Sequence, residues 1–287
     1  MKIIVLGKNG QVAQSLQDCI KSEVEIESIF LSRDDFSINS SDILSLVEKH
    51  RPNFIINCCA YTDVEGAEDD FENAYRVNAL LLKYIGEASK KFNIPVIHFS
   101  TDYVFDGMKK ESYIPSDQKN PLSVYGQTKS DGEDFLLNET EKAWILRTSW
   151  VYSPYGKNFF KTMYKLLRTR KRLTVISDQI GSPTAAHDLA NAVLSIIKEP
   201  ASYPYGVHHI SGAGETSWFG FACEIQKNMR TNDILSSTML EEITTEHYLT
   251  KAKRPLNSRL SADIFKLKSW KDSLAEVFKH YKEEENI

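Results

Sequence analysis

The chain has 287 residues, 41% of them hydrophobic, which is enough for a substantial core in one large domain or in one domain plus a lobe. Its net charge of −4 and its sequence pI of about 6.0 argue against a nucleic-acid partner. No apolar run reaches membrane-spanning length, no leader-like segment precedes the first strand, and the four cysteines have no CxxC spacing. We therefore expect a reduced, cytoplasmic protein without a membrane partner.

The first half of the chain alternates between strand and helix patterns. Residues 2–6 form a largely apolar run typical of a strand buried on both faces of a parallel sheet, and a turn at residues 7–10 leads into a helix that ends near residue 20. Further predicted strands cover residues 24–31, 54–57, 94–100 and 144–148, and further helices cover 41–50, 72–92 and 122–138. This order predicts an α/β fold with a doubly wound parallel sheet of the Rossmann type, whose ligands bind beyond the carboxyl ends of the strands.

After residue 150 the pattern loosens. Short strands at about 173–176 and 205–210 mix with helices near 158–169, 185–198, 216–229 and 271–281. We therefore expect a dinucleotide-binding domain at residues 1–150 and a smaller, mixed α/β substrate-binding lobe at residues 151–287. The pattern leaves open whether the chain crosses back into the first domain.

The first turn is a candidate for holding a dinucleotide. Gly7, Gly10 and Ala13 follow the first strand with GxxGxxA spacing, at the start of a helix. Glycine permits a tight turn and a close approach of the backbone to a pyrophosphate, whose charge is favoured at a helix N-terminus. Two glycines also occur in plain strand-to-helix turns, so this spacing does not decide the question alone.

The end of the second strand bears on the choice of coenzyme. An acidic residue there accepts a hydrogen bond from the ribose 2′-hydroxyl of NADH, whereas a basic residue tolerates the 2′-phosphate of NADPH. Ser32 and Arg33 favour NADPH, while Asp34 and Asp35 keep NADH possible. An ordinary surface arginine is the competing interpretation of Arg33.

The segment STDYVFDG at residues 100–107, followed by YGQTK at residues 125–129, carries the strongest chemical signal. A phenol such as that of Tyr125 has a pKa of about 10 and is a poor acid or base at neutral pH unless its surroundings shift that value. Lys129 lies one helical turn later on the same face, where its charge would favour the tyrosinate and lower that pKa. Thr101 could hydrogen-bond the same substrate oxygen. The three side chains predict proton transfer coupled to hydride transfer, with a tyrosine that only contributes packing as the alternative.

Nearly the whole chain resembles the dTDP-4-dehydrorhamnose reductases, a family within the extended short-chain dehydrogenase/reductases. The resemblance rests on residues 7–11, 57–68, 100–107, 125–129, 146–152, 158–159, 178–184, 254–255 and 257–258. It implies NADPH- or NADH-dependent reduction of the C4 ketone of dTDP-4-dehydro-β-L-rhamnose to dTDP-β-L-rhamnose. This reaction is the last step of dTDP-rhamnose biosynthesis, and a cell-surface polysaccharide is the expected destination of the sugar.

The resemblance also implies roles for individual residues. Thr101, Tyr125 and Lys129 would form the catalytic set, with Lys129 holding the nicotinamide ribose. Cofactor contacts beyond the glycine turn at Gly7 would come from Gly10, Gln11 and Val12 at the pyrophosphate, Asp35 and Phe36 near the adenine, and Ala60, Tyr61 and Thr62 along its length. The sugar nucleotide would meet Thr101, Asp102 and Trp150.

Three further residues need an interpretation of their own. Arg254, before Pro255, could bind a diphosphate through two hydrogen bonds or cap a helix. Trp218 is expected to be structural. In some members of the family acidic side chains bridge a homodimer through a divalent metal, and Ser15 and His187 stand in the matching places here. We therefore expect no metal, while a homodimer stays possible.

Rival functions also stay open. Related sugar-nucleotide dehydratases follow the threonine with an Asp-Glu pair, and here Asp102 is followed by Tyr103, which argues against water elimination. The chain could instead reduce another nucleotide-linked 4-keto-6-deoxy sugar, or form the talose rather than the rhamnose product. A non-catalytic, nucleotide-binding regulatory subunit, like the β subunit of methionine adenosyltransferase, is the alternative outside enzymes.

Overall fold

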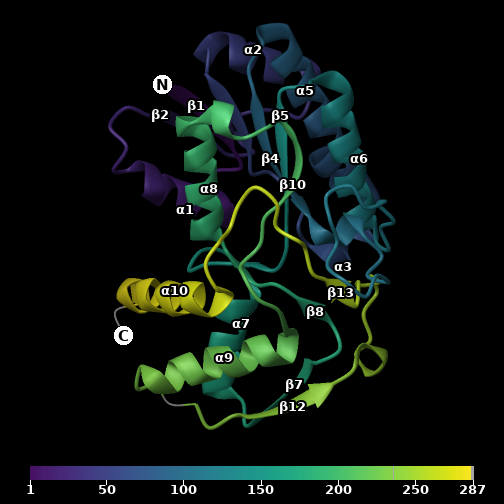
Figure 1. Cartoon of the computed structure of the whole chain (residues 1–287), viewed down its shortest axis with the longest axis vertical. Helices are drawn as coiled ribbons and strands as arrows, with labels where there is room; N and C mark the ends of the chain where they lie inside the picture. Colours follow the sequence, from purple (N-terminus) through teal and green to yellow (C-terminus); the bar gives the residue numbers. More distant parts are fainter. Residues whose placement is uncertain (235, 286–287) are drawn as a thin grey trace.

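A six-stranded parallel sheet organises most of the molecule in the computed structural model, which describes residues 1–234 and 236–285 (Figure 1). In spatial order its strands are β2 (Glu27–Leu31), β1 (Lys2–Leu6), β3 (Phe54–Asn57), β4 (Val96–Thr101), β5 (Ala143–Thr148) and β10 (Gly206–His209). Every neighbouring pair is parallel. The predicted doubly wound sheet is thereby confirmed, and its topological switch point, where such folds bind ligands, lies between β1 and β3.

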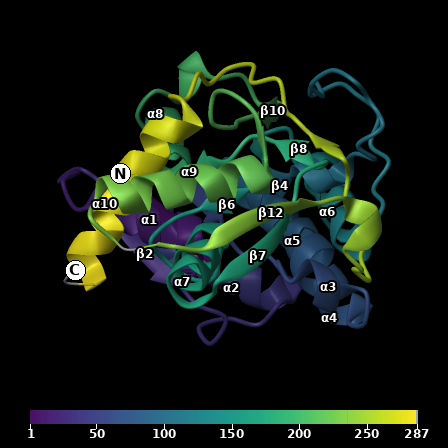
Figure 2. The same cartoon turned by 90° about the horizontal axis from the view of Figure 1, so that it is seen from below.

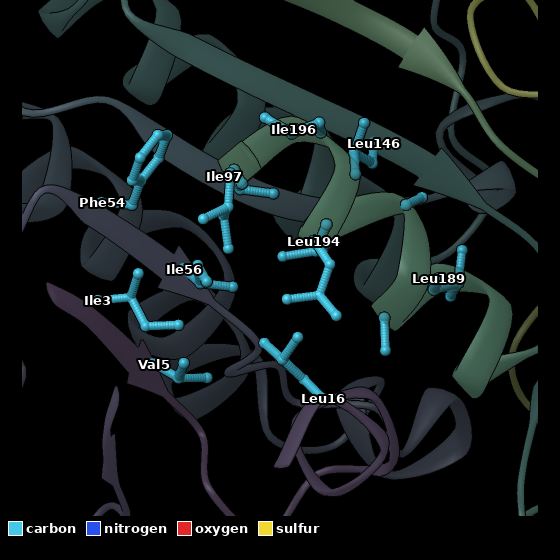
Figure 3. Packing of buried hydrophobic residues seen from close by; sticks show 14 of the residues in the cluster. Ile3, Val5, Leu16, Phe54, Ile56, Ile97, Leu146, Leu189, Leu194 and Ile196 are labelled. Carbon is cyan, nitrogen blue, oxygen red and sulfur yellow. The ribbon is translucent and has the colours of Figure 1, made fainter. Parts of the chain in front are cut away.

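Helices cover both faces of the sheet (Figure 1). One face carries α1 (Gln11–Ile20) and α8 (Ala186–Lys198), and the other carries α2 (Ser40–His50), α5 (Leu81–Phe92) and α6 (Val124–Glu139). Side chains alternate along each strand, so Ile3 and Val5 face α1 and α8 while Ile4 and Leu6 face the opposite helix layer. Figure 3 shows the first of these two cores, in which strand residues meet Leu16, Leu189, Leu194 and Ile196.

The helix predicted over residues 72–92 is confirmed, and it contains a π-helical turn. A short helix α3 (Val64–Ala67) precedes α4 (Phe71–Tyr75), a π-helical turn (Arg76–Leu80), and then α5. The π turn places buried Asn78 toward the backbone of Tyr61, which the regular 3.6-residue pattern did not predict. A 3-10 turn (Asp102–Val104) follows β4 directly.

The rest of the chain forms a smaller lobe beneath the carboxyl edge of the sheet (Figure 1). Its helices α7 (Phe159–Thr169), α9 (Trp218–Thr231) and α10 (Trp270–Glu285) enclose a second core that is rich in aromatic side chains. Strand β7 (Arg172–Ile176) pairs in parallel with β12 (Met239–Ile243), as Figure 2 shows from below, and β12 was not predicted. The remaining elements are β6 (Val151–Tyr152), β8 (Ile180–Gly181), β9 (Thr184–Ala185), β11 (Thr216–Ser217), β13 (Asn257–Ser258) and 3-10 turns at Pro200–Ser202 and Thr245–His247.

The chain passes from this lobe back to the sheet. After β9, helix α8 packs against α1, and β10 then pairs with β5 at the edge of the large sheet. The first sheet therefore takes one of its six strands and one of its covering helices from residues beyond 150.

No helix within residues 1–234 and 236–285 is long and apolar enough to cross a membrane. Over the same ranges, no group of three or more His, Cys, Asp or Glu side chains is arranged to hold a metal ion. Ser15 is buried, and Nδ1 of His187 lies 3.4 Å from Sγ of Cys19.

Candidate active site

The carboxyl end of β4 and the start of α6 meet at the centre of the site. The Ser123 side chain caps α6 by accepting a hydrogen bond from the Gly126 amide at 3.2 Å. A Cβ atom added at Gly126 would lie 2.2 Å from the Tyr103 carbonyl oxygen, so only glycine allows the helix to approach the turn after β4 this closely. That approach brings Tyr125 to the end of β4, where Thr101 lies.

Thr101 and its neighbour form a buried polar pair. The Thr101 hydroxyl donates to Oδ1 of Asp102 at 3.0 Å and accepts from the Tyr103 amide at 3.2 Å. Burial raises the pKa of Asp102 to about 6, and hydrogen bonds from Ser258 and Thr101 partly counter that increase. The Oδ2 atom of Asp102 is buried and has no hydrogen-bond partner of ordinary geometry among the described residues. A buried polar atom of this kind is expected where a ligand completes the site.

Tyr125 behaves differently from the sequence-based expectation. Burial raises the pKa of Tyr125 to about 12, a hydrogen bond with Thr101 acts in the opposite direction, and the Asp102 carboxylate raises the value further. Lys129 does not lower this pKa below its usual value, because its Nζ atom turns to the strand instead. It donates to the Phe99 carbonyl oxygen at 2.6 Å and lies 3.1 Å from Nε2 of His98. The cofactor-free site thus keeps Tyr125 protonated at neutral pH.

The turn between β1 and α1 has the shape required for a dinucleotide. Gly7 has φ +92°, and a Cβ atom there would lie 2.7 Å from the carbonyl carbon of Cys58. Helix α1 begins after Gly10, and no side chain caps it, so the amides of its first turn remain open to an anion. Gln11, beside them, accepts from Asn158 at 2.8 Å and so ties the turn to the lobe. These residues fit a bound pyrophosphate.

The end of β2 carries the residues predicted to select the coenzyme. The Asp35 carboxylate accepts hydrogen bonds from the Ser32 amide and hydroxyl at 2.7 and 2.8 Å, and these bonds lower the pKa of Asp35. Arg33 is exposed, and Phe36 packs against the core beneath α2 and α5. The turn itself occupies the Asp35 carboxylate, whereas Arg33 and Asp34 are both exposed at this end of the strand.

The segment after β3 is held by a residue that the sequence did not reveal. Ala60, Tyr61 and Thr62 follow β3, and Asn78 fixes the Tyr61 backbone through hydrogen bonds of 2.8 and 3.2 Å. Asn78 also donates to the Thr128 hydroxyl of α6 at 3.1 Å. An asparagine inside an apolar helical pattern was the signal available for this role.

The lobe supplies the remaining predicted side chains. Trp150 has φ +50°, and its ring stacks on Trp218 with centroids 3.6 Å apart. Arg254 donates from Nη2 to Glu65 at 2.8 Å, while its Nε atom is buried without a partner in the described part of the chain. Burial raises the pKa of Tyr103, and the Arg254 charge opposes that effect, which places the guanidinium beside the phenol. Arg254 therefore caps no helix.

Comparison with known proteins identifies the family of the chain. The family model described as RmlD substrate binding domain matches residues 1–283. A dTDP-4-dehydrorhamnose reductase from Aggregatibacter actinomycetemcomitans is 38% identical over 264 residues, 90% of each chain. The structure of a dTDP-4-dehydrorhamnose reductase from Clostridium acetobutylicum superposes with a TM-score of 0.92 at 36% identity, covering 98% of this chain and 100% of the other.

A second solved structure bears on the cofactor. The dTDP-4-dehydrorhamnose reductase from Bacillus anthracis, determined in complex with NADP, superposes with a TM-score of 0.90 at 33% identity. That likeness covers 97% of this chain and 99% of the other. With the match to the family model over nearly its full length, the chain belongs to the RmlD substrate binding domain family.

Proposed function

We propose that this chain is an NADPH-dependent reductase that converts the C4 ketone of dTDP-4-dehydro-β-L-rhamnose into the hydroxyl of dTDP-β-L-rhamnose. The observation that carries the proposal is the hydrogen bond between Thr101 and Tyr125 at the carboxyl end of β4, with Lys129 one turn further along α6. Relatives that bear the name of this activity align with nine-tenths of the chain, which supports the choice of substrate.

Tyr125 is the acid of the reaction. Bound NADPH supplies the hydride. The Tyr125 hydroxyl gives its proton to the C4 oxygen as negative charge develops there. Because burial raises the pKa of Tyr125 to about 12, the phenol carries its proton at neutral pH, as a reductase requires. The Thr101 hydroxyl holds the carbonyl oxygen beside that phenol.

The cofactor is held at the carboxyl edge of the large sheet, around the topological switch point between β1 and β3. The open amides of α1 take the pyrophosphate, Arg33 takes the 2′-phosphate, and Lys129 and Tyr125 contact the nicotinamide ribose. The complete set of cofactor residues is Gly7, Gly10, Gln11, Val12, Arg33, Asp35, Phe36, Ala60, Tyr61, Thr62, Tyr125 and Lys129.

The sugar nucleotide is held from both halves of the molecule. The unpartnered Oδ2 of Asp102 accepts from a sugar hydroxyl, and Trp150 lies against the sugar. Arg254 binds the diphosphate through its unpartnered Nε. Thr101 completes the set.

Direct turnover tests the proposal. Purified protein is incubated with enzymatically prepared dTDP-4-dehydrorhamnose and either NADPH or NADH, and the loss of reduced-nicotinamide absorbance is followed while NMR identifies the product. Formation of dTDP-L-rhamnose supports the proposal, and formation of the C4 epimer assigns the talose-forming reaction. Cofactor binding without turnover rejects this substrate and favours another keto sugar or a regulatory subunit.

We also propose that the reaction takes place in the cytoplasm. The four cysteines are free thiols, and Cys58 and Cys59 are adjacent beside the glycine turn. Cell fractionation with antibody detection tests this, and recovery of the protein outside the cytoplasmic fraction would contradict it. Whether the protein forms a homodimer is measured on the same preparation by light scattering.

A further inference from the structure

Three buried polar side chains lie in a row behind the catalytic tyrosine. Asn57 ends β3, His98 lies on β4, and Lys129 lies on α6. The Asn57 Nδ2 atom lies 3.1 Å from Nδ1 of His98, and Nε2 of His98 lies 3.1 Å from Nζ of Lys129. Asn57 and His98 have no exposed surface, and Lys129 is 2% exposed. No role for His98 was predicted from the sequence.

The orientation of the Asn57 amide fixes the histidine tautomer. The Cys59 backbone amide donates to Oδ1 of Asn57 at 3.1 Å, so the NH2 group must face His98. An amide nitrogen only donates, and Nδ1 of His98 must therefore accept and carry no proton. Burial lowers the pKa of His98 well below its usual value, and the charge that Lys129 carries when it is protonated adds to that effect. The ring is neutral, and its one proton is on Nε2.

The Nε2 proton points at Lys129. An ammonium group has three donors and no lone pair, whereas an amine accepts one hydrogen bond. Lys129 also donates to the Phe99 carbonyl oxygen at 2.6 Å. The side-chain polar atoms of the row, in this orientation of Asn57, are complementary when Lys129 is a neutral amine.

The surroundings of Lys129 shift its protonation equilibrium toward the amine, while the ammonium still predominates at neutral pH. Burial lowers the pKa of Lys129 to about 8, and the Glu133 carboxylate one turn later on α6 opposes that effect. Glu133 is itself bound by Arg147 of β5 at 2.9 and 2.7 Å. The thiols of Cys58 and Cys59 also face Lys129, and burial raises the pKa of both, so neither supplies a negative charge.

We propose that His98 is a positioning residue that stabilises the neutral amine form of Lys129 in the cofactor-free protein, so that Lys129 takes up a proton when the dinucleotide binds at mildly alkaline pH. The proton comes from the buffer: a new N–H bond forms on Nζ, and the buffer acid loses its proton. The bound phosphates and ribose favour the charged form. This inference rests on the proposed function only in that Lys129 is the residue that contacts the cofactor.

The first test reads the tautomer in the cofactor-free protein, where no turnover is needed. Histidine ¹⁵N shifts, assigned to His98 through the backbone, are followed from pH 6 to 9, and lysine ¹⁵Nζ shifts report Lys129. We expect a Lys129 midpoint near 8 and, at pH 9, a neutral His98 with its proton on Nε2. A proton on Nδ1, or an imidazolium, overturns the proposal even if the protein proves to be an active reductase.

Two substitutions of the row give opposite results. Asn57→Asp presents only acceptors, so it draws the His98 proton to Nδ1 and raises the Lys129 midpoint. In His98→Gln the amide oxygen can accept a hydrogen bond from Asn57, and the NH2 group can donate one to Lys129. The pH midpoint of Lys129 titration should therefore stay unchanged. His209→Gln on β10 is the matched control, since His209 is equally buried and bonds to the Tyr113 carbonyl oxygen instead. Unchanged Lys129 titration in Asn57→Asp contradicts the proposal.

Calorimetry tests the proton uptake. NADPH is titrated into the protein in two buffers of different ionisation enthalpy at pH 6.5 and at pH 9. Uptake approaches roughly one proton per chain at the higher pH and falls toward zero at the lower one. Tight NADPH binding with no such pH dependence overturns the uptake, whereas failure of NADPH to bind overturns the proposed function and leaves the tautomer result standing.

Discussion

The indole rings of Trp150 and Trp218 lie face to face, with centroids 3.6 Å apart and planes inclined by 9°. The Trp218 Nε1 atom donates to Gln179 at 3.1 Å, and Gln179 donates to the Thr245 hydroxyl at 3.1 Å. Trp218 therefore holds the ring that we assign to the sugar and is itself anchored to the lobe.

Replacing Trp218 by alanine should weaken substrate binding without removing the chemistry. An aromatic pair contributes about 0.5–1.5 kcal/mol beyond its buried area, so KM for the sugar nucleotide should rise by roughly 2- to 15-fold. The Kd for NADPH should stay within about 2-fold. Trp218→Phe, which keeps a stacking ring, should recover most of the loss, and equal KM values in both variants would contradict the stacking role.

Tyr125→Phe should remove the acid while leaving the fold intact. The loss in kcat should be about 10²- to 10⁴-fold, the usual contribution of general acid catalysis. NADPH binding, followed by fluorescence, should remain nearly unchanged. Tyr84→Phe on α5 is the control, because Tyr84 packs against the core away from the site. Turnover in Tyr125→Phe equal to that of the control would reject the assignment.

Arg33→Ala should reduce the preference for NADPH. A charge-assisted hydrogen bond contributes about 1.5–3 kcal/mol, so KM for NADPH should rise by roughly 10- to 150-fold. NADH has no 2′-phosphate and serves as the internal control in the same variant. Equal effects on both coenzymes would show that Arg33 acts on the shape of the β2 turn instead.

Glu133→Gln should destabilise the fold by leaving Arg147 buried without its partner. Breaking a buried ion pair costs about 3–5 kcal/mol, measured as a shift in urea unfolding. Asp134→Asn is the neighbouring control, because Asp134 is 57% exposed and its pair with Lys119 should contribute less than about 1 kcal/mol. Similar losses in the two variants would refute the difference between buried and exposed pairs.

The Glu133–Arg147 ion pair should also make the stability of the wild-type protein sensitive to acid. Burial raises the pKa of Glu133, but hydrogen bonds and charge from Arg147 outweigh it and hold the value below the usual 4.5. A carboxyl group whose pKa is lower in the folded than in the unfolded protein stabilises the fold fully at any pH above its unfolded-state pKa. That contribution is lost as the pH falls through the folded-state pKa. Wild type should therefore lose stability below about pH 4.5 more steeply than Glu133→Gln.

Local patterns predicted much of this protein. The apolar strands, the glycine turn and the helix that carries Tyr125 and Lys129 are properties of short segments, and the parallel sheet follows from their order. The strand predicted from residue 24 begins only at Glu27, because residues 21–25 form turns in which Val24 is almost fully exposed. An apolar residue in a turn adds to the hydrophobic sequence pattern in the same way as an apolar residue in a strand, so the pattern alone placed the start of the strand too early.

Contacts between distant segments could not be predicted in this way. Asn57 and His98 are 41 residues apart, and Arg254 meets Glu65 across 189 residues. The sequence indicated that Lys129 would lower the pKa of Tyr125, because both lie on one helix face. It could not show that His98, on strand β4, lies close enough to contact the Lys129 amine. The direction in which a buried amine points depends on the partners that the tertiary fold supplies.

The return of the chain to the sheet affects how the protein is made. Until β10 leaves the ribosome, β5 is an open sheet edge, and until α8 arrives, Trp144 and Leu146 lack their covering layer. At typical rates, the roughly 60 residues between β5 and β10 take about 3–12 s to synthesise. During that interval the nascent sheet is a partner for chaperones and for other unfinished copies. Slow translation between β5 and β10 would lengthen the exposure, so the yield of soluble protein should depend on the codons of this stretch.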